Sequence, residues 1–503
     1  MIISYALFVL LTLLFLIFTF RKSDLKRNNL PPGPWRLPFI GNLHQVGELP
    51  HRSLQQLSSI HGPLMFLKLG SVPTLVVSSA EIAKEIFKNH DFAFSGRPKL
   101  YAANRLGYNG SAITFTPYGD YWKEIRKIMM LELLSAKRVQ SFQAVRLEEV
   151  QNLIHSIALS SGTPVNLSQL TLSLTNNVVC RIAFGTRFGG PSSKFYEVVR
   201  ETQELLGGFC LADFFPWLWW LNKFNGYESR LEKNFKELDN FYDKVIEDHA
   251  AHNDDSKRLG AMEQHDEDLV HVLLQLQKDS NQAIALNDVK IKGVLTDIFI
   301  AGTDTASATM IWTMSELVKN PDKMEIAQKE VRELVLLKEK KGMVEESDLP
   351  MLPYLKSVVK EALRIHPPAP LLVPRETIQT CTIKGYEVPS GTRVFINAKA
   401  IAMDPTCWEN PNEFTPERFL CSPVDYFKGQ HVEMLPFGAG RRGCPGVNFA
   451  MPLIELSLAN LLLCFDWKLP NGMRRDEVDM QEAIGLTMHK KSPLCLIPSP
   501  FFQ

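Results

Sequence analysis

The stretch Phe437-Gly-Ala-Gly-Arg-Arg-Gly-Cys444-Pro-Gly446 decides the fold, because it presents one cysteine on a glycine-rich turn beside a fixed cation. A thiolate ligand on haem iron pushes electron density toward oxygen and favours cleavage of the O–O bond. The glycines let the backbone bend tightly and approach a flat macrocycle that a Cβ would strike. The stretch therefore predicts that Cys444 is the axial ligand of a haem iron, with a buried structural cysteine as the alternative.

The same ten residues resemble the haem-binding signature of the cytochrome P-450 monooxygenases, which they match at Phe437, Gly440, Arg442, Cys444 and Gly446. In this register Arg442 can pair with a haem propionate through a charge-assisted hydrogen bond. Phe437 is expected to cover the outer side of the sulfur. The resemblance implies haem b, iron protoporphyrin IX, as the cofactor.

A second motif overlaps the first, since Gly438-Ala-Gly-Arg-Arg-Gly443 has the spacing of a GxGxxG dinucleotide fingerprint. That fingerprint requires a preceding strand within a βαβ unit and an acidic residue about twenty positions later. Here Pro436 precedes the glycines and Cys444-Pro445 interrupts them. These neighbours favour a haem site over a dinucleotide site.

Composition limits the classes of partner. The 503 residues carry 55 basic and 55 acidic side chains, so the formal net charge is zero and no general attraction to nucleic acid is expected. The eight cysteines are scattered without a C-x-x-C pair, so they suggest neither a zinc site nor a disulfide framework. A reduced, cytosol-facing compartment is expected. The polar run at residues 250–268 predicts a surface loop between helices.

The N-terminal residues predict a membrane anchor. Residues 2–20 are uncharged and almost wholly apolar, which is long enough for one transmembrane helix. A basic cluster follows at once, and the positive-inside rule then places the rest of the chain in the cytosol. Residues 21–37 form a basic and proline-rich hinge that resembles the hinge of microsomal family members, with an SH3-type ligand as the alternative. The expected location is the endoplasmic reticulum membrane, crossed once.

Residues 38–503 are the expected haem-binding monooxygenase domain, mainly α, with the cytochrome P-450 fold of many helices and small β-sheets. Residues 294–317 predict a long central helix rather than a second membrane span, because Asp297, Asp304 and Glu316 would be costly in lipid. The other expected elements are a hairpin at residues 63–78, a short strand within residues 388–400, a helix at residues 355–365, and a helix from Asn320-Pro321 to residue 333.

The middle of the predicted central helix, Ala301-Gly-Thr-Asp-Thr-Ala306, resembles the family's oxygen-activation motif. Oxygen activation in a dry pocket needs a hydroxyl that holds a water and relays protons, and Thr305 is the candidate. Asp304 is the candidate for feeding protons from outside. A helix threonine can instead bond back to a carbonyl one turn earlier, and both roles are compatible. Ala306 stands where many members have a hydroxyl, which leaves the details of the relay open.

Three further motifs match the family. Glu361 and Arg364 stand three apart on one helical face. With Arg418 of the Pro-Glu-Arg-Phe segment they resemble the Glu-Arg-Arg triad, to which we assign folding and haem retention. Trp122 and Arg126 form W-x-x-x-R and, by resemblance, both reach a haem propionate. Arg375 is expected to do so from another side, because buried carboxylates need cationic partners; a surface arginine is the alternative for Arg126.

The run Asp213-Phe-Phe-Pro-Trp-Leu-Trp-Trp220 packs five aromatic rings into eight residues. Such rings suit a membrane interface, although a buried core loop fits almost as well. By resemblance the run is the loop over the substrate entrance. The resemblance also implies a largely apolar substrate pocket, lined by Phe115, Phe299, Ala301, Ala369, Leu372, Val373 and Leu486.

The motifs occur along the chain in the order typical of the family. By this resemblance the chain is identified as a plant microsomal, A-type cytochrome P-450 of specialised metabolism. The implied reaction inserts one oxygen atom into a small apolar metabolite, a terpenoid, an alkaloid or a phenylpropanoid-derived compound. No convincing flavin or nicotinamide motif is present, so electrons from NADPH are expected to arrive through NADPH–cytochrome P-450 reductase, with cytochrome b5 as a second candidate partner. The substrate's identity and the position of attack stay open.

Two other classes of function stay open beside this one. A haem-thiolate isomerase or dehydratase would rearrange an oxygenated substrate without O2 or a reductase, and the Asp304-Thr305 pair argues against it. A non-catalytic haem carrier or sensor would share the cysteine loop. Dependence on a reductase separates the first from a monooxygenase, and NADPH consumption separates the second.

Overall fold

The computed structural model describes residues 29–188, 194–259, 267–280, 283–338, 342–420, 425–483 and 485–501. The anchor predicted at residues 2–20 and the hinge up to residue 28 lie outside the described residues. Within them, one helix, Val447–Cys464, is long and apolar enough to cross a membrane, but 72% of it is buried inside the protein. Its apolar side chains therefore belong to the core.

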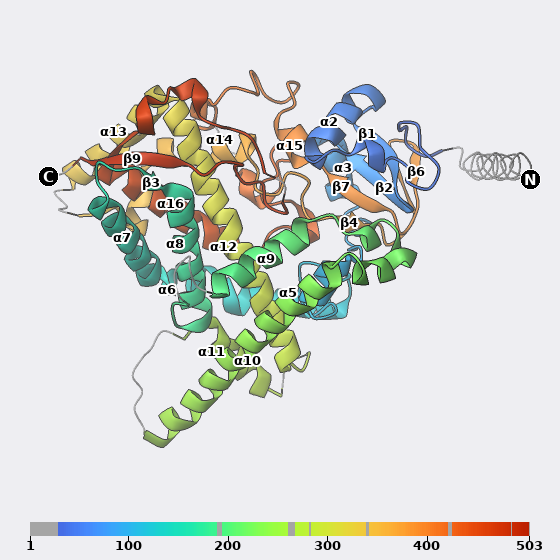
Figure 1. Cartoon of the computed structure of the whole chain (residues 1–503), viewed down its shortest axis with the longest axis horizontal. Helices are drawn as coiled ribbons and strands as arrows, with labels where there is room; N and C mark the ends of the chain where they lie inside the picture. The colour runs from blue at the N-terminus through green and yellow to red at the C-terminus, as the bar shows by residue number, and fades with distance from the viewer. Residues whose placement is uncertain are drawn as a thin grey trace, which may run out of the picture.

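Helices dominate the chain, as predicted (Figure 1). The α-helices are α2 Pro50–His61, α3 Ala80–Asn89, α4 Tyr101–Leu106, α5 Asp120–Ile128, α6 Ala136–Ser141, α7 Gln143–Leu159, α8 Leu167–Phe184, α9 Lys194–Gly207, α10 Tyr227–Leu259, α11 Leu269–Lys278, α12 Asp288–Lys319, α13 Pro321–Leu337, α14 Pro353–Ile365, α15 Ala398–Ala402 and α16 Val447–Cys464. Short helical turns include η2 Met129–Leu133, η4 Pro216–Lys223, η5 Glu346–Met351, η6 Pro416–Phe419 and η8 Gly440–Arg442.

The strands form small sheets. They are β1 Leu64–Leu69, β2 Val72–Val77, β3 Val165–Asn166, β4 Arg375–Glu376, β5 Cys381–Ile383, β6 Tyr386–Val388, β7 Arg393–Ile396, β8 Phe465–Lys468 and β9 Cys495–Pro500. The sheet orders are β1-β2-β7-β4, β3-β9-β8 and β5-β6. Strands β1 and β2 pair antiparallel, which confirms the predicted hairpin, and β2 runs parallel to β7. The largest sheet lies with α2 and α3 at the right of the view in Figure 1.

The central helix α12 is longer than predicted, at 32 residues. It begins where the Asn287 side chain accepts a hydrogen bond from the Lys290 amide, an N-cap interaction. It ends before Pro321, whose fixed φ suits the first position of α13. Helix α14 stops at Ile365, as the following prolines predicted. The α12 side chains are buried on nearly all faces, which places this helix inside the protein.

The prediction of a loop at residues 250–268 is wrong for its first part, because α10 continues to Leu259. Its polar composition misled the prediction. No glycine or proline interrupts residues 250–259, and a polar stretch without these residues can stay helical while facing water.

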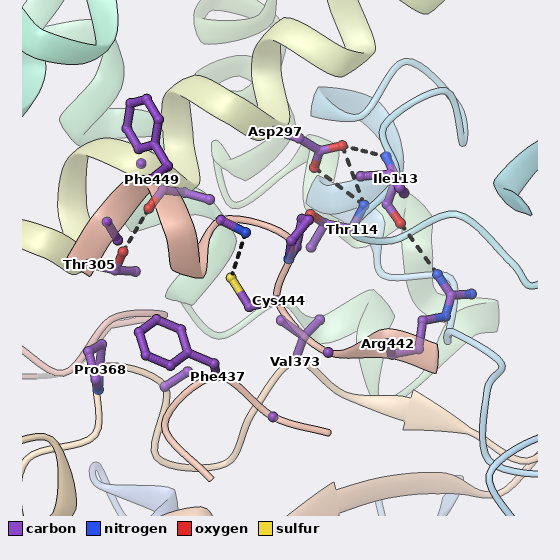
Figure 2. Close-up of a pocket in the computed structure, with 18 of the residues that line it drawn as sticks. Ile113, Thr114, Asp297, Thr305, Pro368, Val373, Phe437, Arg442, Cys444 and Phe449 are labelled. Carbon is purple, nitrogen blue, oxygen red and sulfur yellow. Dashed lines mark hydrogen bonds between the residues drawn. The ribbon is translucent and has the colours of Figure 1, made fainter. Parts of the chain in front are cut away.

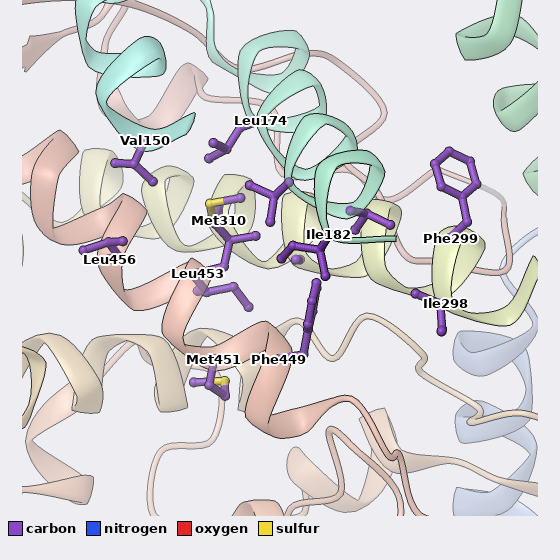
Figure 3. Close-up of a cluster of buried hydrophobic side chains, with 14 of the residues drawn as sticks. Val150, Leu174, Ile182, Ile298, Phe299, Met310, Phe449, Met451, Leu453 and Leu456 are labelled. Atoms are coloured by element: carbon purple, nitrogen blue, oxygen red, sulfur yellow. The ribbon is translucent and has the colours of Figure 1, made fainter. Parts of the chain in front are cut away.

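The main core lies where α8, α12 and α16 pack together (Figure 3). Leu174 and Ile182 of α8 and Met310 of α12 point into it, together with Leu453 of α16. Gly302 permits the approach of α8 to α12, because an added Cβ would lie 3.1 Å from Val179 Cγ2. This packing fixes α12 against the start of α16 and therefore against the cysteine loop.

Candidate active site

A cavity of about 270 Å³ lies between α12 and the loop that precedes α16. Cys444 and Phe437 line it from the loop, and Gly302 and Thr305 line it from α12 (Figure 2). Most of the remaining lining is apolar. The fold therefore brings its two most informative motifs to one space, although Thr305 and Cys444 are 139 positions apart in the chain.

The cysteine loop holds its sulfur by backbone contacts. The Cys444 amide donates to the Phe437 carbonyl at 2.9 Å, and the Gly446 amide donates to Cys444 Sγ at 3.3 Å. The thiol is accessible from the cavity but is otherwise enclosed by protein. Burial raises the pKa of the Cys444 thiol, while the Gly446 amide and the charge of Arg126 act in the opposite direction. The loop thus supplies the contacts that would stabilise a thiolate.

Two glycines of the loop have different physical roles. Gly440 has a φ of +67°, and a Cβ there would lie 2.2 Å from Asp91 Oδ1, so a larger residue is excluded on both counts. A Cβ at Gly446 would lie 3.7 Å from Cys444 Sγ, an ordinary contact distance. The contribution of Gly446 is therefore its amide. Phe437 lines the cavity and packs edge-to-face on Phe427 at 5.4 Å.

Four arginines gather on the cavity wall: Arg97, Arg126, Arg375 and Arg442. Sequence reasoning found the last three and missed Arg97, which follows Gly96, a residue that makes an isolated β-bridge with Glu376. Arg442 and Arg126 also lie over the Trp122 ring, at 4.3 Å and 5.4 Å from its centroid. Trp122 therefore packs against the cationic cluster.

These arginines are held by backbone carbonyls and keep unused donors. Arg442 donates to Ser95 at 2.8 Å, Thr116 at 2.7 Å and Ile113 at 3.4 Å. Arg97 donates to the carbonyls of Thr114, Val373 and Pro374, and Arg126 to that of Gly443 at 2.6 Å. A guanidinium has five N–H groups. Within the described part of the chain, each of these three guanidiniums thus retains at least two for a ligand.

The four arginines bring positive charges close together. Burial and the charges of the neighbouring arginines lower the pKa of Arg442 to about 9 and hold that of Arg97 well below its usual range. Burial likewise lowers the pKa of Arg375 to about 10, although Asp91 lies 3.4 Å from it. A group with two carboxylates would relieve this repulsion. The cavity therefore fits a cofactor that carries two propionates beside the Cys444 sulfur.

Thr305 faces this cavity, and its hydroxyl donates to the Ala301 carbonyl at 2.8 Å. The α12 residues that line the cavity include Ile298, Ala301, Gly302 and Thr305, which follow the i, i+3, i+4, i+7 spacing of one helical face. Thr309 continues that face and donates to the Thr305 carbonyl at 2.9 Å. The back-bonding predicted for a helix threonine is thus present in Thr305 itself.

Asp304 does not line this cavity. It lines a second, more polar cavity of about 580 Å³ on another face of α12, where its Oδ2 lies 2.9 Å from His489 Nε2. Neighbouring helical residues point about 100° apart, so Asp304 and Thr305 cannot share one face. The hydrogen bond and charge of Asp304 raise the pKa of His489 despite its burial. His489 was not found from the sequence.

The predicted apolar lining is only partly in place. Ala301, Ala369, Leu372 and Val373 line the cavity, whereas Phe115, Phe299 and Leu486 do not. Phe299 follows Ile298, which lines the cavity, but its own side chain is buried in the core. There its ring centroid lies 6.0 Å from that of Phe184. Leu486 lines the second cavity.

Asp297 brings a carboxylate to the cavity wall (Figure 2). It accepts a hydrogen bond from the Ile113 amide and a longer one, at 3.3 Å, from the Thr114 amide. Arg442 and Arg97 hold the carbonyls of the same two residues. The wall segment is therefore clamped between α12 and the arginine cluster. Burial raises the pKa of Asp297 to about 6.

The structure also brings together Glu361, Arg364 and Arg418. Arg364 makes two hydrogen bonds to Glu361, at 2.7 Å and 2.8 Å, and Arg418 Nε lies 3.1 Å from Glu361 Oε1. Arg364 also donates to the Pro411 carbonyl at 2.8 Å. The glutamate and Arg364 are fully buried, so these contacts join α14 to the η6 segment.

The aromatic run at residues 213–220 lies on the surface rather than in a core. Trp217, Trp219 and Trp220 are 59%, 48% and 45% exposed, and Phe224 is 80% exposed. Most of them belong to η4, and two residues before it the Phe214 carbonyl accepts a hydrogen bond from the amide of Ser71, in the turn between β1 and β2. This arrangement leaves a patch of large rings open to solvent.

Comparison with known proteins agrees with this geometry. The family model "Cytochrome P450" matches residues 31–496. The chain belongs to the cytochrome P-450 family. It is 67% identical to cytochrome P450 71A9 of Glycine max over the whole of both chains, and 56% identical to Strychnine-11-hydroxylase of Strychnos nux-vomica over 95% of this chain and 93% of the relative. A zebrafish cytochrome P450 with abiraterone matches at TM-score 0.74 and 27% identity, covering 90% of this chain and 100% of that chain.

As a cytochrome P-450, the protein is a monooxygenase, and family membership implies a haem cofactor. The predicted fold class is confirmed by the family match and the solved structure. Because Asp304 and Thr305 face different cavities, this pair of side chains does not by itself exclude a haem-thiolate isomerase. The enzyme class now rests on the relatives instead.

Proposed function

We propose that this cytochrome P-450 is a membrane-bound haem-thiolate monooxygenase that inserts one atom of O2 into a small apolar plant metabolite. The observation that carries the proposal is that Cys444 and Thr305 line one largely apolar cavity beside four arginines. A terpenoid, an alkaloid or a phenylpropanoid-derived compound would suit such a lining. The relative named for hydroxylation of strychnine supports an alkaloid among these classes.

In this proposal Cys444 holds the haem iron, and Arg97, Arg126, Arg375 and Arg442 hold the propionates. When bound, the haem supplies the activation of O2. The Gly446 amide at 3.3 Å from Sγ moderates the basicity of the sulfur. Phe437 packs beside the sulfur and excludes water from it.

Thr305 is proposed to hold a water in the cavity. The Thr305 hydroxyl donates its proton to the Ala301 carbonyl, with 2.8 Å between the oxygens. The hydroxyl oxygen is therefore available to accept a hydrogen bond from that water. Asp304 is proposed to take up protons from the second cavity, with His489 as its hydrogen-bond partner at 2.9 Å. Protons would then cross α12 from its polar side to its apolar side.

The partners proposed are NADPH–cytochrome P-450 reductase, cytochrome b5 and membrane lipid. Residues 2–20 would anchor the chain in the endoplasmic reticulum membrane, followed by the hinge at 21–37 and a cytosolic catalytic domain at 38–503. The exposed rings of Trp217, Trp219, Trp220 and Phe224 support a second contact with the bilayer. The reductase would dock on the side of the cysteine loop.

Microsomes that contain this chain and the reductase test the proposal. A plant-metabolite library is incubated with NADPH and isotopically labelled O2, and products are analysed by mass. We expect a product that carries one labelled oxygen atom and requires the reductase, with Cys444→Ala microsomes as the matched control. A product formed without reductase or label would instead establish the isomerase or dehydratase. Haem binding without product or NADPH consumption for any library compound would contradict the monooxygenase proposal.

A further inference from the structure

We propose that His249, Asp268 and His271 form a zinc site that fastens α10 to α11, away from the haem cavity. His249 lies on α10, Asp268 is the N-cap residue of α11, and His271 lies in the first turn of α11. The two helices pack against each other (Figure 1). One potential ligand atom from each residue lies within 4.8 Å of the other two. Two imidazoles and one carboxylate are a donor set typical of zinc.

The distances leave room for a metal ion after a small adjustment. His249 Nε2 lies 2.8 Å from Asp268 Oδ2, and His271 Nδ1 lies 3.1 Å from Asp268 Oδ1. Zinc bonds of about 2.0–2.1 Å in a tetrahedron separate neighbouring ligand atoms by roughly 3.3 Å. The ligands would therefore need to move apart by about half an ångström. The imidazole rings, whose centroids are 4.7 Å apart at 65°, already face the same space.

The ligands are also oriented by the groups behind them. His249 Nδ1 donates to the Val245 carbonyl at 2.6 Å, which turns Nε2 toward Asp268. Asp268 Oδ1 accepts from the His271 amide at 2.9 Å. Metal-binding imidazoles usually donate their second N–H to a carbonyl or carboxylate, and ligating carboxylates are themselves hydrogen-bonded. His249 has the first feature and Asp268 has the second.

One atom of the cluster lacks a satisfactory partner. Among the described residues, His271 Nδ1 is a buried ring nitrogen without a hydrogen bond, although Asp268 Oδ1 is near. A buried polar atom in that state costs free energy, and its lone pair would be used by a metal. The His271 side chain is 32% exposed, so solvent can reach the open fourth position. Gly185 packs closely against the carboxylate, because a Cβ there would lie 2.7 Å from Asp268 Oδ2.

The test uses the full-length, haem-loaded protein and zinc ions alone. Equilibrium dialysis with elemental analysis gives the zinc bound per haem iron. We expect one tight site whose affinity falls at least roughly 100-fold in Asp268→Asn and in His271→Ala, because loss of a group that only supports a ligand already costs about 10- to 100-fold. Asparagine is a good N-cap residue, so Asp268→Asn keeps α11 capped while it removes the carboxylate. His155→Ala, which removes an exposed histidine of α7, is the matched control and should bind zinc like the wild type.

A second measurement identifies the ligands directly. Zinc-edge X-ray absorption of the loaded protein should show two imidazole nitrogens in the first coordination shell, and the haem iron does not interfere. The carbon monoxide spectrum of each variant reports whether the haem domain is folded. The proposal is overturned if the wild type binds no zinc, or if correctly folded Asp268→Asn and His271→Ala variants bind it with wild-type affinity. In those cases the three residues form only a hydrogen-bonded junction between the helices.

Discussion

Replacing Arg97 with Gln should accelerate loss of haem from this cytochrome P-450. Arg97 lines the cavity, and in the described structure its three hydrogen bonds to carbonyls leave two N–H groups for a propionate. A hydrogen bond to a charged group contributes about 1.5–3 kcal/mol, and each 1.4 kcal/mol is tenfold, so retention should weaken roughly 10- to 100-fold. The rate of haem transfer to excess apomyoglobin measures this directly.

Two further variants separate charge from packing in that experiment. Arg97→Lys keeps the cation but loses the planar fork, so its rate should lie between those of the wild type and Arg97→Gln. Arg105→Gln is the control, because Arg105 does not line the cavity and instead pairs with Glu232 at 2.6 Å. This substitution should leave the rate of haem loss unchanged. A wild-type rate of haem loss in Arg97→Gln would refute the assignment of the arginine cluster to the propionates.

Three other predictions follow from the site. Thr305→Ala should keep haem and substrate-induced spectra but divert NADPH-derived electrons to peroxide; unchanged coupling of NADPH use to product would rule out the water-holding role and direct attention to Thr303. His489 has a raised pKa, so its pairing with Asp304 should stabilise the protein fully below the ordinary histidine pKa of 6.5 and less as pH rises through the raised value. Thermal melts against pH should lose this component in His489→Gln, and identical pH profiles would contradict it. Glu361→Ala leaves two buried guanidiniums without their carboxylate and should cost about 3–5 kcal/mol of unfolding free energy, seen in denaturant melts; a loss below about 1 kcal/mol would mean that the triad is not structural.

Structural features that depend only on residues within one short segment could be predicted from the sequence. The cysteine loop, the start of α13, the end of α14 and the β1–β2 hairpin are set by glycines, prolines and capping residues within a few positions. The Glu361–Arg364 pair follows from helical spacing alone. These features were predicted because their causes lie inside the segment that shows them.

Features that depend on packing between distant segments were harder to predict. Asp304 and Thr305 are adjacent in the motif, and helix geometry turns them to different faces, but which cavity each face meets is set by the packing around α12. The same rotation turns Phe299 into the core. Arg97 reaches the first cavity and His489 the second from segments distant in sequence from both α12 and the cysteine loop, so only the fold reveals them.

Every role proposed for the cavity residues depends on which side chain binds the haem iron. The carbon monoxide difference spectrum of the reduced protein tests it most directly, with Cys444→Ser compared against the wild type. We predict the red-shifted Soret band of a thiolate-ligated haem in the wild type and its loss in the variant. A Cys444→Ser protein that binds haem and shows the same red-shifted band would contradict the assignment of Cys444 as the axial ligand.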